Sequence, residues 1–136
     1  MTMNGAIDYA ATYFKFKTPT PIHGTPTNAT LKRLKTELRA NASSVESDLG
    51  GGDYGYLGLV LTNPEYASIS LVPFVAPNHP GNLHIDPNVA PIAAVNLKEA
   101  HKEACLKYYE CKNVEKALLR HIQDAIEPKY QSFLAP

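Results

Sequence analysis

Apolar residues recur at intervals of three and four in two segments of the chain, which is the spacing of one helical face. In the first segment, Thr25 can cap a helix whose first position is Pro26, and Gly50 is a natural end for it. The second segment, residues 93–126, predicts one long helix or two nearly continuous helices with a break at Asn113. The expected inward positions are Leu31, Leu34, Leu38, Ala42 and Val45 in the first segment and Leu97, Ala100, Ala104, Tyr108, Cys111, Leu118, Ile122 and Ala125 in the second.

A different pattern precedes the first of these helices. Phe14 and Phe16 alternate with lysines in "YFKFK", as the residues of a half-buried strand do. The prolines of "TPTPIHG" end that alternation and favour extended backbone. The sequence therefore predicts a short extended N-terminal arm at residues 1–24 and a helical domain at residues 25–136.

The middle of the chain predicts a short helix. Asn63 is a candidate N-cap and Pro64 suits the first helical position. The helix is expected to reach about Leu71, with Tyr66 and Ile69 facing inward.

Residues 73–91 contain five prolines and neither a helical nor a strand period. Such composition predicts a long exposed loop, and long loops of this kind are often functional. The predicted fold class is therefore mostly α, with a short N-terminal arm and a long Pro-rich loop.

Composition narrows the range of partners. The 136 residues include 13 Lys plus Arg and 13 Asp plus Glu, so the formal net charge is zero and no overall field attracts nucleic acid or anionic membranes. The longest apolar run, "LGLVL", is far shorter than the roughly twenty residues of a membrane span. Cys105 and Cys111 lie on different sides of one predicted helix and are expected to be small buried residues of a reducing compartment. We expect a soluble cytoplasmic protein without a membrane partner.

Candidate catalytic or metal-binding chemistry is sparse. The glycine-rich stretch "LGGGDYGYLGLVLT" lacks the Lys-Ser/Thr of a phosphate-binding loop, so a joint that needs backbone freedom is favoured. His101 and Cys105 are one helical turn apart, but two ligands do not make a metal site. A metal-dependent or hydrolytic enzyme centred on His79, His84 and His101 is the weakest of three hypotheses. We expect no catalytic residue, metal or cofactor, and favour a protein that is not an enzyme.

Four blocks in a fixed order carry a family resemblance. They are "TPTNATLKRLKTELRANASSV", "GGGDYGYLGLVLTNPEYASIS", "PFVAPNHPGNL" and "HKEACLKYYECKNVEKALLRHIQDAIEPKYQSFL". Together they resemble the Gag-like region of copia-type LTR retrotransposon polyproteins, from about Ile22 onward. The resemblance implies a helical bundle similar to a retroviral capsid N-terminal domain. It also implies self-association into an oligomer or particle that can enclose the element's RNA.

The resemblance assigns the glycine-rich stretch to a family motif, and we expect this motif to act as a hinge. The glycines are expected to let the first helix move against the second, while Leu57, Leu59 and Leu61 hold the second helix in the core. The residues that match the motif are Gly50, Gly51, Gly52, Gly55, Gly58, Pro64, Glu65 and Tyr66.

Two hypotheses about partners follow. In the first, the chain is a homo-oligomer whose contacts use the basic face of the first helix and the outer face of the long helix, and nucleic acid is bound weakly at most. The candidate interface residues are Arg33, Arg39, Tyr109 and Lys112. In the second, an adopted or truncated capsid-like adaptor binds a protein partner through residues 73–91.

Overall fold

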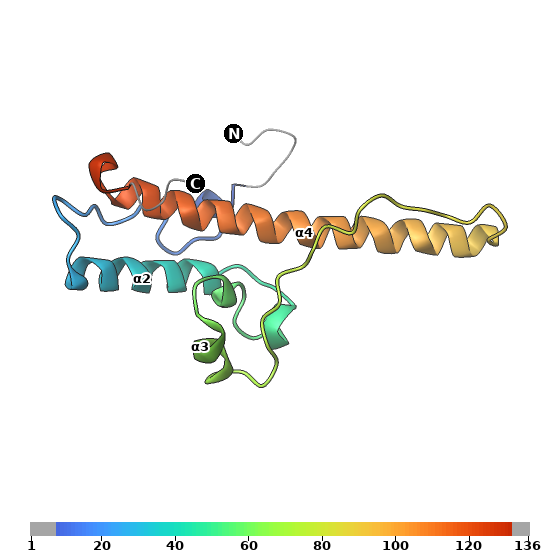
Figure 1. Cartoon of the computed structure of the whole chain (residues 1–136), viewed down its shortest axis with the longest axis horizontal. Coiled ribbons are helices and arrows are strands. Elements are labelled where there is room, and N and C mark those ends of the chain that lie inside the picture. Colours follow the sequence, from blue (N-terminus) through green and yellow to red (C-terminus); the bar gives the residue numbers. More distant parts are fainter. Residues whose placement is uncertain (1–7, 132–136) are drawn as a thin grey trace.

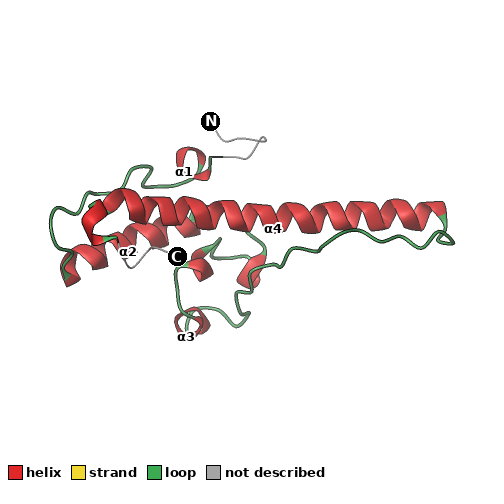
Figure 2. Ribbon diagram, turned by 45° about the horizontal axis from the view of Figure 1, so that its top comes forward, coloured by secondary structure: helices red, strands yellow, loops and turns green. Residues whose placement is uncertain are grey.

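The computed structural model describes residues 8–131, and this part of the chain is mostly helical and contains no β-strand. One long helix, α4, extends along the whole molecule, and α2 packs beside its C-terminal half (Figure 1). Figure 2 shows the two short helices, α1 and α3, on either side of this pair. The helices are α1 (Tyr9–Thr12), α2 (Asn28–Ser43), α3 (Asn63–Ala67) and α4 (Pro91–Ala125), and single 3-10 turns occupy Leu49–Gly51, Leu57–Leu59 and Pro128–Tyr130.

The long helix is continuous over 35 residues. Pro91 occupies its first turn, where the missing N–H has no consequence, and no proline or glycine follows before Ala125. The predicted break at Asn113 is absent. A single asparagine lowers helix propensity too little to interrupt a helix whose residues Cys111 and Val114, on either side of it in the sequence, are buried. The chain leaves α4 at Ile126 in an extended conformation and forms an isolated parallel bridge with Ile22.

The core lies between α2, the C-terminal half of α4 and the N-terminal segment. Leu31 remains 42 % exposed although the spacing places it on the inward face, because the packing of α2 begins one turn later, at Leu34. Phe14 and Ile22 of the N-terminal segment are almost completely buried, which stabilises the fold by about 2 kcal/mol for each side chain. The buried apolar core consists of Tyr9, Phe14, Ile22, Leu34, Leu38, Ala42, Val45, Tyr56, Cys111, Val114, Leu118, Ala125 and Ile126.

The predicted strand at "YFKFK" is wrong. Phe14 follows the short helix α1, and Phe16 lies in an irregular segment whose backbone bonds a side chain instead of a second strand. The Phe16 N–H donates to Asn41 Oδ1 (2.8 Å), and Asn41 Nδ2 donates to the Phe16 carbonyl (3.1 Å). The region expected to be an extended arm thus contains a helical turn, and residues 1–7 of that arm lie outside the described residues.

The N-caps of α2 and α3 lie one or two residues from the positions predicted from the sequence. Thr27, rather than Thr25, caps α2, because its hydroxyl reaches the Thr30 N–H while the Thr30 hydroxyl reaches back to the Thr27 N–H. In α3 the same reciprocal arrangement joins Thr62 and Glu65. That helix ends at Ala67, short of the expected end.

Candidate functional site

The N-terminal half of α4 extends beyond the core and has no buried residue from Pro91 to Glu110 (Figure 1). Large apolar side chains on this half are nevertheless numerous. Contiguous exposed apolar surface on a folded protein commonly marks a site of interaction. The exposed fractions are 74 % for Ile92, 56 % for Val95, 43 % for Leu97, 60 % for Leu106 and 52 % for Tyr109.

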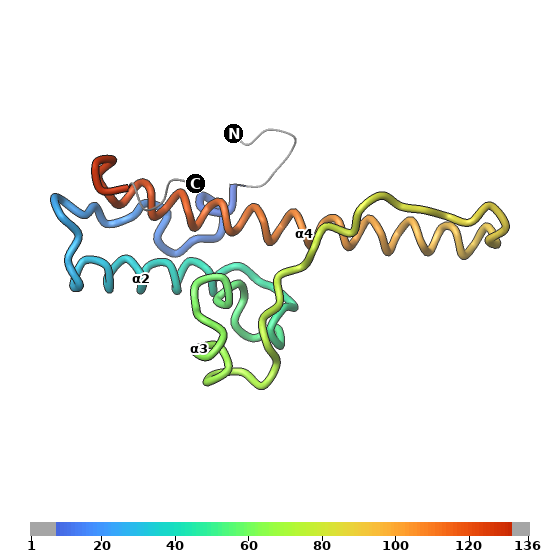
Figure 3. The backbone as a smooth tube through the Cα atoms, viewed as in Figure 1, coloured from blue at the N-terminus to red at the C-terminus, as the bar shows by residue number. Residues whose placement is uncertain are grey.

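The segment between α3 and α4 contains no helix or strand and runs along the exposed half of α4 (Figure 3). His79 lies edge-on to Tyr108 and Tyr109, with ring centroids 5.1 and 5.7 Å away. His101 lies with its Nε2 2.7 Å from the Gly81 carbonyl oxygen. The segment therefore covers the face of α4 that carries His101 and Tyr108 and leaves the opposite face open.

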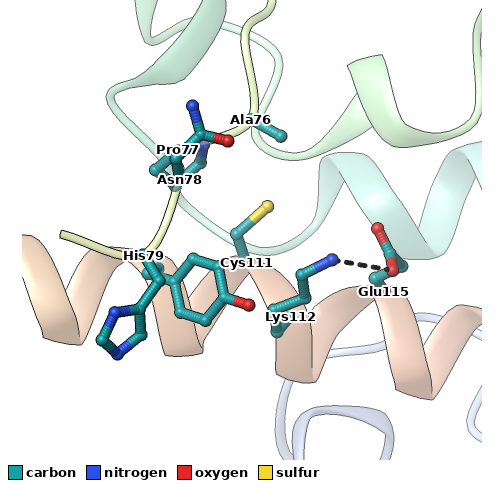
Figure 4. A pocket seen from close by; sticks show the side chains of 8 residues that line it. Ala76, Pro77, Asn78, His79, Cys111, Lys112 and Glu115 are labelled. Atoms are coloured by element: carbon teal, nitrogen blue, oxygen red, sulfur yellow. Dashed lines mark ion pairs between the residues drawn. The ribbon is translucent and has the colours of Figure 1, made fainter. Parts of the chain in front are cut away.

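A small pocket of about 270 Å³ lies where this segment meets α4 (Figure 4). Its wall includes His79, Cys111 and the ion pair between Lys112 Nζ and Glu115 Oε1, which are 3.6 Å apart. Burial raises the pKa of the Cys111 thiol, so it is protonated and weakly nucleophilic at neutral pH. The pocket offers a weak thiol and one ion pair.

The histidines do not converge. His101 is occupied by the Gly81 carbonyl, and Cys105 Sγ lies 3.9 Å from its ring nitrogens. Between residues 8 and 131, no three His, Cys, Asp or Glu side chains are grouped so that they could hold a metal ion. The structure therefore does not bring His79, His84 and His101 together as a metal site.

The predicted interface residues lie on two helices and form bonds within the chain. Arg33 donates to the Pro21 carbonyl (3.2 Å), and Arg39 pairs with Glu65 at 3.2 Å. On α4, the Tyr109 hydroxyl lies 3.3 Å from His79 Nε2, and Lys112 pairs with Glu115 and lies over the Tyr108 ring. Both arginines thus make contacts within the chain, and Tyr109 remains 52 % exposed. A role of these four residues in an interface stays a prediction.

The family-motif residues meet around Tyr66. The Tyr66 hydroxyl donates to the Gly50 carbonyl (2.6 Å), and a Cβ at Gly50 would lie only 2.1 Å from that hydroxyl. Glu65, beside Tyr66, accepts from Arg39 and so joins α3 to α2. Gly50 also has φ +58°, which glycine adopts without strain.

The other motif glycines are packed closely as well. A Cβ at Gly55 (φ +55°) would lie 2.4 Å from the Val45 carbonyl oxygen, and a Cβ at Gly58 would lie 2.0 Å from the Phe74 ring. Gly51 and Gly52 also have positive φ, but the space beside them is more open. The structure gives Gly50, Gly55 and Gly58 a role in close packing; movement of α2 about them stays a prediction.

A buried polar cluster was missed by the sequence reasoning. Glu37 and Asn41 of α2 and His121 of α4 are each at most 4 % exposed. His121 Nε2 donates to the Glu37 carboxylate (2.9 Å), and Asn41 Nδ2 lies 3.4 Å from His121 Nδ1. The hydroxyl and N–H of Thr20 also donate to Glu37. A signal was available, because positions 37 and 41 are one turn apart and adjoin the inward positions of α2.

The electrostatics of Glu37 show how this cluster is balanced. Burial acts to raise the pKa of Glu37, but hydrogen bonds from Thr20 and His121 outweigh it and hold the pKa below its ordinary value. The carboxylate is therefore ionised at neutral pH and binds the N-terminal segment to both long helices. This arrangement stabilises the fold and presents no exposed reactive group.

Comparison with protein-family models, with curated proteins and with solved structures found no match. Among the described helices, none is both long and apolar enough to span a bilayer.

Proposed function

We propose that this chain is a Gag-like structural protein of the retrotransposon type that self-associates into an oligomer or a capsid-like particle. The observation that supports this most directly is the exposed half of α4, where large apolar side chains remain between 43 % and 74 % exposed. The sequence resemblance supplies the kind of assembly. Repetition of a weak contact is sufficient to build a shell, because many contacts add by multivalency.

The particle can enclose nucleic acid, but we expect the chain to bind it only weakly. The zero net charge gives the chain no general attraction for phosphate backbones, so packaging by this chain would depend on local contacts. An assembly of this kind operates without a catalytic centre or a cofactor, and we place it in the cytoplasm.

The proposal is tested by light scattering and negative-stain electron microscopy of the purified chain. Samples span a wide range of concentration and ionic strength, with and without added RNA. We expect an average mass that rises with concentration, and rings, tubes or particles at the highest concentrations. A strict monomer under every condition contradicts the proposal.

A second candidate function is an adaptor that binds a protein partner through residues 73–91. It is favoured by the exposure of Val75 (66 %) and Leu83 (36 %) in a segment without regular structure. Peptide-binding partners often recognise extended, Pro-rich segments of this kind. Replacing Val75 and Leu83 by serine would then abolish capture of a partner without changing the average mass of the chain, whereas unchanged capture excludes this segment.

A further inference from the structure

Six exposed residues form a straight stripe on the open face of α4. Their spacing alternates between three and four, so they lie on one side of the helix over its first 19 residues. Apolar residues occupy both ends of the stripe, and an acidic and a basic residue occupy its centre. The α4 stripe consists of Ile92, Val95, Glu99, Lys102, Leu106 and Tyr109.

The α4 stripe is complementary to a second α4 stripe that runs in the opposite direction. When a second α4 is laid antiparallel, with a two-fold axis midway between positions 99 and 102, acidic meets basic and apolar meets apolar at every position. In this register Ile92 faces Tyr109, Val95 faces Leu106 and Glu99 faces Lys102, each pair occurring twice. We propose that the α4 stripe binds a second copy of this chain in this antiparallel register.

The surroundings of the stripe leave it accessible. The segment between α3 and α4 lies mainly on another side of the helix, where it bonds His101 and contacts Tyr108. It also reaches the C-terminal end of the stripe, where His79 contacts Tyr109 and leaves that residue 52 % exposed. Among the described residues, no ion pair within the chain involves Glu99 or Lys102. Both charges are thus free to pair across the two-fold axis.

The order of charged and apolar residues along the α4 stripe favours a second copy of this chain over an unrelated partner. An apolar helix face alone fits many partners, but a central acid–base pair flanked symmetrically by apolar residues is matched by the same stripe reversed. Each copy contributes the same surface, which is the property of a two-fold interface. This inference rests on the proposed self-association and assigns it a surface.

The size of the contact predicts weak association. Positions 92 to 109 cover about 26 Å of helix at 1.5 Å per residue. One helix pair of this length lies at the small end of specific interfaces, so we expect a dissociation constant in the micromolar range or weaker. Weak two-fold contacts are the kind that a reversible assembly needs.

Charge exchange tests the register. Glu99→Lys places four positive charges at the centre of its homodimer, and Lys102→Glu places four negative charges there. We expect each variant to dimerise roughly tenfold more weakly than the native chain in analytical ultracentrifugation. A 1:1 mixture of the two variants restores complementary pairs and should associate as tightly as the native chain. The double variant E99K/K102E should do so by itself.

Matched controls separate this effect from net charge. Glu46→Lys and Lys17→Glu alter the net charge by the same amounts, and both positions are exposed and outside the α4 stripe. They should leave association unchanged. Because all substituted side chains are exposed, circular dichroism should show the native helix content in every variant.

The outcomes distinguish this inference from the proposed function. Native association that neither single variant weakens overturns the α4 stripe but leaves self-association intact. Weakening that the mixture does not restore overturns the antiparallel register. A native chain that stays monomeric at every concentration overturns both the stripe and the proposed function.

Discussion

Asn41 is the residue through which the N-terminal segment is bound most specifically to α2. Its amide accepts from the Phe16 N–H and donates to the Phe16 carbonyl, as a neighbouring strand would. Asn41 is completely buried and the two bonds are partly buried, so water replaces them poorly in Asn41→Ala. We predict that this substitution destabilises the fold and loosens the N-terminal segment.

The magnitude follows from the groups that lose their partners. Two backbone groups of Phe16 lose a hydrogen bond, and each polar group left unsatisfied in a buried position costs about 1–3 kcal/mol. Alanine has a higher helix propensity than asparagine, which returns up to about 0.7 kcal/mol. We expect a net loss of about 3 kcal/mol in the free energy of unfolding, which is a large part of the stability of a single domain.

Asn96→Ala is the matched control. Asn96 is exposed near the start of α4, so the same chemical change there should alter stability by no more than the difference in helix propensity, up to about 0.7 kcal/mol. Urea unfolding followed by circular dichroism measures both variants. With a slope of about 2 kcal/mol per molar urea, the Asn41→Ala midpoint should fall by about 1.5 M relative to the control.

Limited proteolysis gives an independent readout of the N-terminal segment. Lys15 and Lys17 flank Phe16 and are exposed trypsin sites. In Asn41→Ala, cleavage there should accelerate, because the segment opens more often. The reasoning is refuted if Asn41→Ala unfolds within about 0.5 kcal/mol of Asn96→Ala and is cleaved at the same rate.

Two further predictions concern charge and backbone. Because the pKa of Glu37 is lowered in the folded state, its contribution to stability is present above the unfolded-state pKa and is lost as the pH falls through the folded-state value. The free energy of unfolding should therefore decrease below about pH 5, and Glu37→Gln should make that decrease shallower; equal slopes contradict this. Gly55→Ala should cost several kcal/mol because its Cβ meets the Val45 carbonyl, whereas Gly81→Ala, also at positive φ but in open space, should cost about 1 kcal/mol. Equal thermal unfolding midpoints for the two variants would exclude the close contact as the cause.

The long helices could be predicted from the sequence because their signals are local. Spacing of apolar residues predicted both α2 and α4, and it correctly placed Leu34, Leu38, Cys111 and Leu118 in the core. Spacing fails where burial depends on the rest of the chain. Leu97 has the spacing of a core residue but is 43 % exposed, because α2 lies beside the C-terminal half of α4 and does not extend to this part of the helix (Figure 1).

The strand prediction failed for a related reason. Alternation of Phe16 with lysines indicates a segment with two unlike faces, but a strand also needs a partner with free backbone groups. The side-chain amide of Asn41, 25 positions away on a helix, supplies the donor and the acceptor instead. Such a long-range contact between a side chain and the backbone leaves no pattern in the sequence.

The division of α4 into two halves separates stability from association. The half after Glu110 carries the buried residues and is fixed by α2 and the N-terminal segment. The half before it depends on helix propensity and on contacts such as that of His101 with Gly81, and an isolated helix of this length is only marginally stable in water. Packing against a second copy would supply the burial that this half lacks. Substitutions of the α4 stripe should therefore alter association with little effect on the core, whereas substitutions of Asn41 should do the reverse.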